Sequence, residues 1–178
     1  MNCKQPITVW ITGLPASGKT TLGKALQSRI SQHEIPVVLL DGDEVRKGLC
    51  SDLGFSPADR TENLRRVASI AALLNSQGVV TICCFVSPQV SMRQMARSII
   101  GKESFFEVFA DAPVEVCQLR DNKGNYSKAI NGSLSDFTGI SSSYEAPVNP
   151  NLRLNTAMLS EKEAADTLYN HFVQWVDK

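Results

Sequence analysis

Residues 13–20, GLPASGKT, fit the phosphate-loop pattern G-x-x-x-x-G-K-[ST] without a mismatch. An apolar run at residues 7–12 precedes the pattern and a helical periodicity at residues 19–31 follows it, which is the context that such loops require. Glycines let backbone N–H groups turn inward around phosphate oxygens, and the helix N-terminus adds partial positive charge. The pattern therefore predicts a nucleoside triphosphate site made of Gly13, Leu14, Pro15, Ala16, Ser17, Gly18, Lys19, Thr20 and Thr21.

Two side chains of this loop have expected roles in chemistry. Lys19 is expected to reach the β- and γ-phosphates, and the Thr20 hydroxyl is expected to bind Mg²⁺. ATP and Mg²⁺ are therefore the predicted cofactors. The sequence has neither a D-x-x-G after the third predicted strand nor an N-K-x-D, the signatures of GTPase switches. A small-molecule kinase fits better than a motor or a switch.

Short apolar runs alternate with helical patterns along the whole chain. We expect strands at residues 7–12, 37–40, 79–86, 105–110 and 151–155, and helices at 19–31, 61–77, 90–100 and after a capping box of Ser160 and Glu163. This alternation predicts an α/β fold, with a parallel sheet flanked by helices on both faces. The 178 residues make one domain, 1–178. Residues from about 121 onward turn rich in Gly, Ser, Asn and Lys, and we interpret residues 121–143 as a mobile lid.

Composition excludes several classes of protein. Eighteen basic side chains balance eighteen acidic ones, which argues against a partner that is a nucleic-acid polymer. The longest apolar run, near residues 79–86, is far too short to span a membrane, and residues 1–6 have no signal-peptide layout. His33 and His171 lie far apart and predict no metal site. Five cysteines without a C-x-x-C pair predict reduced thiols and a cytoplasmic location: Cys3, Cys50, Cys83, Cys84 and Cys117.

Charged and aromatic residues follow the second predicted strand, where a second substrate is expected to bind. Carboxylates at Asp41 and Asp43 can hold a Mg²⁺-bound water or orient an attacking hydroxyl, and Arg46 can pair with an anion. A plain helix cap by one of the two aspartates is the alternative. Further on, Arg60 and Asn63 lie one helical turn apart and can bind a small anion together. Phe55 nearby is either stacked on a flat group or an ordinary core staple.

Five further motifs give the chain a family resemblance. They are FVSP at 85–88, FEVF at 106–109, RDNKG at 120–124, FTGI at 137–140 and YEAP at 144–147. Together with the segments above, they resemble the adenylyl-sulfate kinase family over residues from about 7 to 156. That family transfers a phosphoryl group from MgATP to the 3′-hydroxyl of adenylyl sulfate, which makes the activated sulfate donor. The resemblance implies that this chain is such a phosphotransferase, with a nucleotide as its small-molecule substrate, and that it forms a homodimer.

The resemblance also implies roles for single residues. Asp43 would orient or deprotonate the 3′-hydroxyl, and Lys123 would close from the lid onto the phosphates. Anionic groups of the acceptor would be held by Arg46, Arg60 and Asn63, its adenine would lie between Phe55 and Phe137, and backbone of Val86 and Ser87 would line the pocket. Arg120 would lie over the ATP adenine.

Ser87 matches the serine that the family records as a phosphoserine intermediate, so the catalytic set becomes Lys19, Asp43 and Ser87. Hydrogen bonding to the substrate is the alternative role for this hydroxyl. Direct in-line transfer needs only positioning and charge neutralisation, and a second covalent step gains little.

Five positions depart from the family pattern, and they leave alternatives open. Glu44 stands for Asn, Gln89 and Val90 for Tyr-Arg, Ser141 for Asp and Ser143 for Pro. An added carboxylate and a lost cation should weaken the hold on an anionic acceptor. One alternative is therefore a related kinase with another nucleotide acceptor, for example a cytidine diphosphoramidate of capsule synthesis. A non-catalytic nucleotide-binding regulator is the other, although Lys19, Thr20 and Asp43 are all present.

Overall fold

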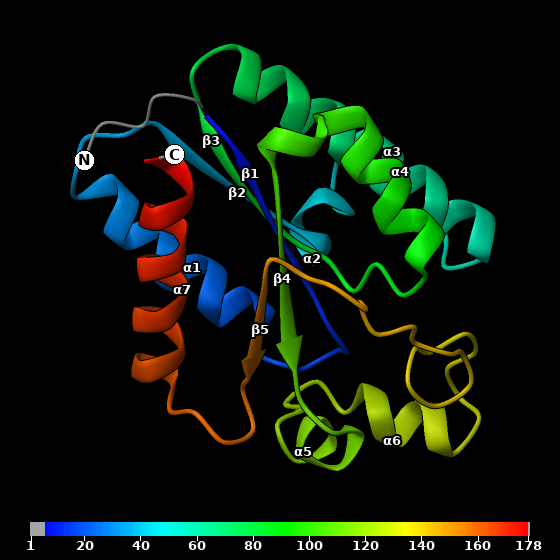
Figure 1. Cartoon of the computed structure of the whole chain (residues 1–178). Helices are drawn as coiled ribbons and strands as arrows, with labels where there is room; N and C mark the ends of the chain where they lie inside the picture. The colour runs from blue at the N-terminus through cyan, green and yellow to red at the C-terminus, as the bar shows by residue number, and fades with distance from the viewer. Residues whose placement is uncertain (1–5, 178) are drawn as a thin grey trace.

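A parallel sheet forms the centre of the protein in a computed structural model that describes residues 6–177 (Figure 1). Its five strands are β1 (Thr8–Thr12), β2 (Val37–Asp41), β3 (Val80–Cys84), β4 (Phe105–Asp111) and β5 (Leu152–Asn155), in the spatial order β2-β3-β1-β4-β5. Every neighbouring pair is parallel. The predicted α/β fold is confirmed.

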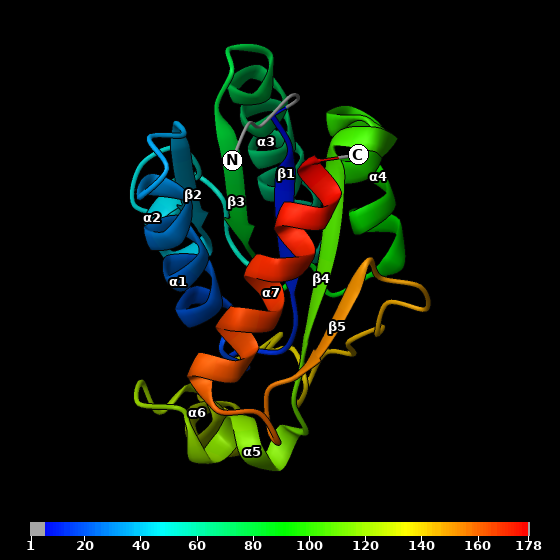
Figure 2. The same cartoon turned by 60° about the vertical axis from the view of Figure 1, so that its left-hand side comes forward.

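Helices cover both faces of this sheet (Figure 2). On one face, α1 (Lys19–Ser31) and α7 (Glu161–Val176) pack on a core that includes Val9, Ile11 and Ile82. On the other face, α3 (Pro57–Ser76) and α4 (Val90–Ile100) pack on a core around Trp10 and Phe105. Coverage of both faces leaves every residue of β1 and β3 buried, so these strands lack the polar–apolar alternation of a half-exposed strand.

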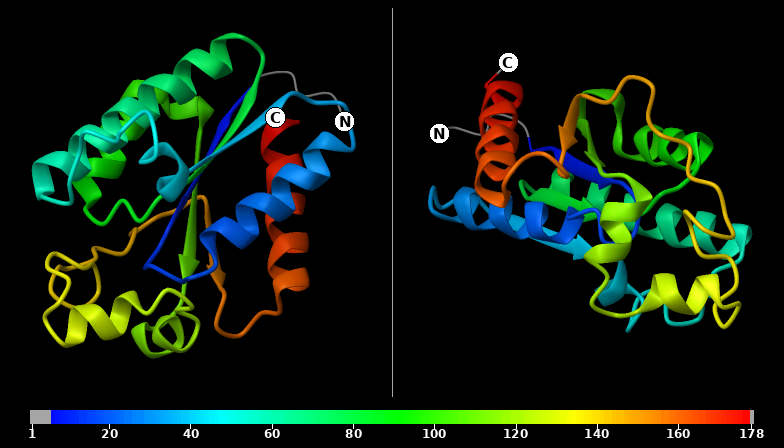
Figure 3. Two further views of the ribbon diagram at one scale, coloured as in Figure 1. Left: turned by 180° about the vertical axis from the view of Figure 1, so that it is seen from behind. Right: turned by 90° about the horizontal axis from the view of Figure 1, so that it is seen from below.

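Short helices occupy the edge of the sheet where the strands end (Figure 3). They are α2 (Gly42–Val45), α5 (Val114–Leu119) and α6 (Asn125–Ile130); a single turn of 3₁₀ helix, Lys102–Ser104, precedes β4 instead. The helix α6 lies inside the predicted lid. Its Tyr126 ring meets Phe137 edge-on, with ring centres 4.8 Å apart, and both belong to a small apolar cluster with Leu14 of the phosphate loop. Mobility of the lid remains a prediction.

Most predicted bounds agree with the structure, and two differ for a physical reason. The helix α3 begins at Pro57 rather than at residue 61, because the Ser56 hydroxyl caps it by accepting from the Asp59 amide and proline suits a first helical turn. The strand β3 ends at Cys84, so the prediction that it continues to residue 86 is wrong. Residues 85–88 instead form a loop in which Ser87 adopts a φ of +38°. The capping box of Ser160 and Glu163 at α7 is confirmed.

Parallel pairing gathers the predicted functional segments at one edge. The phosphate loop follows β1, residues 41–46 follow β2, and residues 85–88 follow β3. Cys50, Cys83, Cys84 and Cys117 are buried free thiols, and Cys3 lies outside the described residues. Between residues 6 and 177, none of the helices has the length and apolar character that a bilayer crossing requires.

Candidate active site

The phosphate loop is held in place by close backbone packing. A Cβ added to Gly13 would lie 2.5 Å from the Ala110 carbonyl oxygen, so only glycine fits there. Gly18 has a φ of +93° at the N-terminus of α1, a conformation that glycine adopts without strain. Leu14 and Ser17 are buried behind the loop, Leu14 within the apolar cluster of the lid. The loop is thus anchored to the core on its inner side, by Gly13, Leu14 and Ser17.

Lys19 lies inside the loop rather than on its surface. Its Nζ donates a hydrogen bond to the Leu14 carbonyl oxygen at 2.6 Å, and the residue is only 9% exposed. Burial lowers the pKa of Lys19 to about 8, and the nearby carboxylates of Asp41 and Asp43 oppose that fall. Phosphate oxygens close to Nζ would therefore favour the protonated form of Lys19.

A hydroxyl and a carboxylate meet beside Lys19. Thr20 Oγ1 donates to Asp41 Oδ2 at 2.7 Å, and Asp41 Oδ1 accepts from the Asp43 amide at 3.0 Å. Asp41 is thus the N-cap of α2, as the capping alternative proposed. Hard oxygen ligands of this kind suit Mg²⁺, which is usually bound by one or two protein groups together with phosphates. The sequence predicts Thr20 as the direct ligand of Mg²⁺ and Asp41 as a carboxylate that can hold a Mg²⁺-bound water; the hydrogen bond between the two side chains makes Asp41 a candidate direct ligand as well.

A first cavity of about 510 Å³ opens on the α7 side of the loop. Thr21 and Arg120, two of the residues predicted to bind ATP, lie in its lining, and Arg120 donates to the Thr156 carbonyl oxygen at 2.8 Å. Its size falls within the usual range for ligand sites. No motif predicted the rest of its wall, which comes from Leu22, Asn122, Thr156, Leu159, Ser160, Glu161 and Ala164.

A second cavity of about 500 Å³ lies on the other side of the loop, between α2, α3 and the lid. It brings together all the predicted acceptor residues: Asp43, Arg46, Phe55, Arg60, Asn63, Val86, Ser87, Lys123 and Phe137. Thr138 also lines the cavity and was not a predicted site residue; its buried hydroxyl has no hydrogen-bond partner among the described residues, like Oδ1 of Asn63. Five of the described residues line both cavities: Ala16, Lys19, Thr20, Arg120 and Asn122. A ligand in either cavity therefore reaches Lys19 and Thr20.

Two arginines frame an exposed aromatic ring at the mouth of this acceptor cavity. The guanidinium carbon of Arg46 lies 4.3 Å from the centre of the Phe55 ring, and that of Arg60 lies 5.5 Å from it. Arg60 also donates to the carbonyl oxygens of Phe55 and Asp136. Phe55 is 54% exposed, so its interpretation as a core staple is wrong, and its ring can stack on a flat ligand.

The lid contributes a cation to the cavity. Lys123 forms an ion pair with Asp43, a contact that joins the loop before α6 to α2. Both side chains are largely exposed. Hydrogen bonding to Asp43, opposed by partial desolvation, raises the pKa of Lys123. This ammonium group therefore stays charged at neutral pH where the lid meets α2.

Ser87 lies in a strained and well-anchored turn. Its hydroxyl accepts from Trp10 Nε1 at 3.1 Å and donates to Thr12 Oγ1 at 2.9 Å. Arg93 donates to the Ser87 carbonyl oxygen at 2.7 Å and pairs with Glu107 at 3.1 Å, both side chains being buried. With the hydroxyl bonded twice to β1, this geometry favours a structural role for it over that of a phosphate carrier.

The five departures from the family pattern lie outside the acceptor cavity. Among the described residues that line it, none is Glu44, Gln89, Val90, Ser141 or Ser143. Glu44 pairs with Lys47 on the surface, the Val90 amide donates to Glu145, and the Ser141 hydroxyl accepts from the Phe137 amide. None of the five contacts the cavity directly, so the weaker hold on an anionic acceptor, which would act at longer range, stays a prediction.

Comparisons with known proteins agree with this geometry. The model of the adenylylsulphate kinase family matches residues 5–155. The adenylyl-sulfate kinase of Paraburkholderia xenovorans (strain LB400) is 46% identical over 173 residues, which are 97% of this chain and 96% of that protein.

Solved structures give the same result. The Mycobacterium tuberculosis APS kinase CysC, in complex with AMPPNP and APS, superposes with a TM-score of 0.91 at 41% identity, over 95% of this chain and 98% of that one. The hexameric APS kinase from Thiobacillus denitrificans superposes with a TM-score of 0.73 at 29% identity, over 96% of this chain and 29% of that one. A family match that spans most of the sequence, close relatives along nearly its whole length and a shared fold place this chain in the adenylylsulphate kinase family.

Proposed function

We propose that this protein transfers the γ-phosphoryl group of MgATP to the 3′-hydroxyl of adenylyl sulfate, which yields ADP and 3′-phosphoadenylyl sulfate. One observation carries the proposal: Lys19 and Thr20 line both a cavity beside α7 and a cavity filled with acceptor-type residues. A donor and an acceptor held there would face each other across the phosphate loop. Phosphoryl transfer needs this arrangement, since it relies on positioning and charge neutralisation.

On the donor side, the chain holds the triphosphate with main-chain amides and one ammonium group. Backbone N–H groups of residues 13–20, apart from Pro15, bind the phosphate oxygens, and Lys19 neutralises charge on the β- and γ-phosphates. Thr20 and Asp41 would hold Mg²⁺, which supplies further charge neutralisation when bound. Arg120 would lie over the adenine of ATP.

On the acceptor side, the residues bind the nucleotide and orient its ribose. Arg46, Arg60 and Asn63 bind the anionic groups, while Phe55 and Phe137 hold the adenine. Asp43 orients the 3′-hydroxyl and accepts its proton as the ribose oxygen bonds to the γ-phosphorus. The bond from that phosphorus to the β–γ bridging oxygen breaks, and ADP leaves.

The lid completes the site in this mechanism. Closure of residues 121–143 brings Lys123 onto the phosphates and excludes water, which would otherwise hydrolyse ATP without an acceptor. The ion pair of Lys123 with Asp43 supports this role, because it already spans the acceptor cavity.

A panel of acceptors tests the function. Purified protein is mixed with MgATP, and ADP release is measured as single acceptors are added: adenylyl sulfate, AMP, and a cytidine diphosphoramidate. We expect release with adenylyl sulfate and its loss in Asp43→Asn. No release with adenylyl sulfate, but release with another acceptor, would assign the protein to a related kinase. No release with any acceptor, together with ATP binding by calorimetry, would favour a regulator.

Assembly and location complete the proposal. From the family resemblance we infer a homodimer, and light scattering on the purified protein tests that state against the hexamer described for the Thiobacillus denitrificans relative. The cytoplasmic location is supported by the four buried free thiols. Cell fractionation checks it directly.

A further inference from the structure

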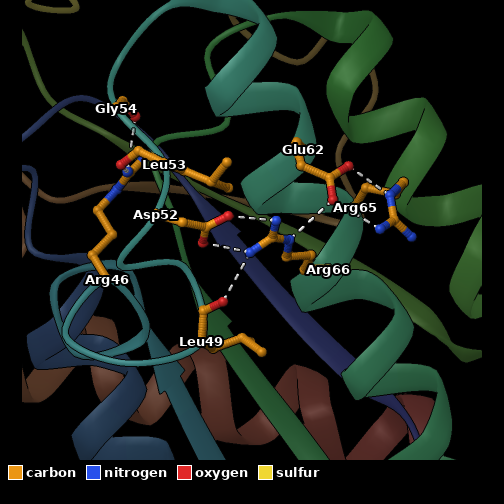
Figure 4. A network of polar contacts seen from close by, with 8 residues as sticks. All are labelled: Arg46, Leu49, Asp52, Leu53, Gly54, Glu62, Arg65 and Arg66. Carbon is orange, nitrogen blue, oxygen red and sulfur yellow. Dashed lines mark hydrogen bonds and ion pairs between the residues drawn. The ribbon is translucent and has the colours of Figure 1, made fainter.

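A polar network fixes the loop between α2 and α3 to the side of α3 (Figure 4). Its centre is Arg66, which donates to both carboxylate oxygens of Asp52, at 2.7 and 2.8 Å. The same guanidinium donates to the Leu49 carbonyl oxygen at 3.1 Å and to Glu62 at 3.0 Å. Arg66 therefore joins one helix to two points of the loop, and its fork-shaped contact with Asp52 is directional.

The loop held in this way holds Arg46 in turn. One nitrogen of Arg46 donates to the carbonyl oxygens of Leu53 and Gly54, at 3.1 and 2.9 Å. These two carbonyls follow Asp52 directly in the chain, and Phe55 comes next. A short run of contacts thus leads from Arg66 through Asp52 to a cation and an aromatic ring of the acceptor cavity.

Apolar packing gives this loop little support of its own. Leu49 is 41% exposed, and Cys50 is the fully buried apolar residue of the segment 47–54. Ordering of such a segment costs conformational entropy, which polar contacts must offset. The neighbouring Arg65 provides a contrast, because its described side-chain hydrogen bonds go to Glu62 alone, within the same helix.

We propose that Arg66, through Asp52, is a positioning residue for the acceptor: it fixes the loop that presents Arg46 and Phe55 before the nucleotide binds. Neither Arg66 nor Asp52 lines the acceptor cavity. The effect is preorganisation, since a loop already in place loses less entropy on binding than a free one. The inference rests on the proposed function for the identity of the acceptor and on the network itself for the ordering of the loop.

The test compares two adjacent arginines that share a partner. Arg66→Ala and Asp52→Asn are measured beside Arg65→Ala, which also loses a contact with Glu62 but none with the loop. We expect Arg66→Ala and Asp52→Asn to raise KM for adenylyl sulfate about threefold to tenfold, with KM for ATP unchanged. Arg66→Lys keeps the positive charge but loses the two-pronged contact with the carboxylate, so its KM should lie between those of wild type and Arg66→Ala. The double variant Arg66→Ala/Asp52→Asn should raise this KM by less than the product of the two single increases, because both changes break the same contact.

Hydrogen exchange measures the ordering without any acceptor. Amides of residues 47–54 should exchange faster in Arg66→Ala than in wild type or Arg65→Ala. Amides of the strands should exchange at the same rate in all three proteins. Equal exchange in the loop would overturn the inference, as would KM changes that match those of Arg65→Ala or affect ATP equally. Wild-type protein inactive with adenylyl sulfate would instead reject the proposed function, and loop exchange would still decide the role of Arg66.

Discussion

Lys19 couples the binding of ATP to the uptake of a proton. Burial lowers the pKa of this amine from 10.5 to about 8, so keeping it charged costs about 3 kcal/mol relative to an amine in water. Triphosphate oxygens against Nζ favour the charged form and should raise this pKa again. At a pH where Lys19 of the free protein is partly deprotonated, ATP binding therefore takes up a proton from solution.

The size of this uptake follows from the titration. With a pKa near 8 in the free protein and one far higher in the complex, uptake should be about 0.1 proton at pH 7, about 0.5 at pH 8 and about 0.9 at pH 9. Calorimetry with MgATP in buffers of different ionisation enthalpy, without acceptor, measures it directly. Lys19→Arg is the control, because a guanidinium stays charged throughout this range, and the difference between the two proteins removes protons that belong to ATP.

Stability without nucleotide gives an independent check of the same pKa. The unfolded chain binds more protons than the folded one between about pH 8 and 10.5, so this group makes the fold more stable as the pH rises through that window. Relative to Lys19→Met, wild type should gain up to about 3 kcal/mol across it in urea unfolding. Uptake near zero at pH 8 and a parallel stability profile for the two proteins would refute the lowered pKa.

Three further outcomes follow from the contacts. Lys123→Ala should slow transfer by about a hundredfold, because the lid loses its cation; single-turnover ADP formation at wild-type rate would remove the lid from the mechanism. Phe55→Ala should raise KM for adenylyl sulfate by about tenfold, the usual effect of losing one stacked ring, and steady-state kinetics with fixed ATP show whether it does. Arg93→Met leaves the buried Glu107 unpaired and should lower unfolding free energy by about 3–5 kcal/mol, whereas Arg93→Met/Glu107→Leu should recover much of it; equal urea midpoints for wild type and the single variant would contradict this.

Local patterns were sufficient to predict the layers of the fold. Residues 79–84 are apolar on both faces except at Thr81, a pattern that indicates burial in the middle of a parallel sheet. The phosphate loop was equally predictable, because its backbone needs glycine at fixed positions. At Gly13, for example, any side chain would collide with the Ala110 carbonyl oxygen. These signals depend on neighbours in sequence, or on the sheet as a whole.

Other features depend on tertiary contacts that spacing alone does not encode. The helix α6 has few buried positions, and its Tyr126 packs against Phe137 and the phosphate loop rather than the sheet, so no apolar stripe announces it. Asp41 was visible as a carboxylate at a strand end, but its bond to Thr20 was not. Arg66 and Asp52 are fourteen residues apart, and they meet only because the loop before α3 lies against the side of that helix.

Eight described residues of the acceptor cavity come from a single stretch, Asp41 to Leu64, and none of these eight lines the first cavity. Changes at residues 42–64 can therefore alter which acceptor binds, while Asp41 and the residues that line the first cavity stay the same. Transplanting residues 42–66 between members of the family is thus a way to exchange one acceptor for another, and Arg66 is included so that the grafted loop keeps its contacts.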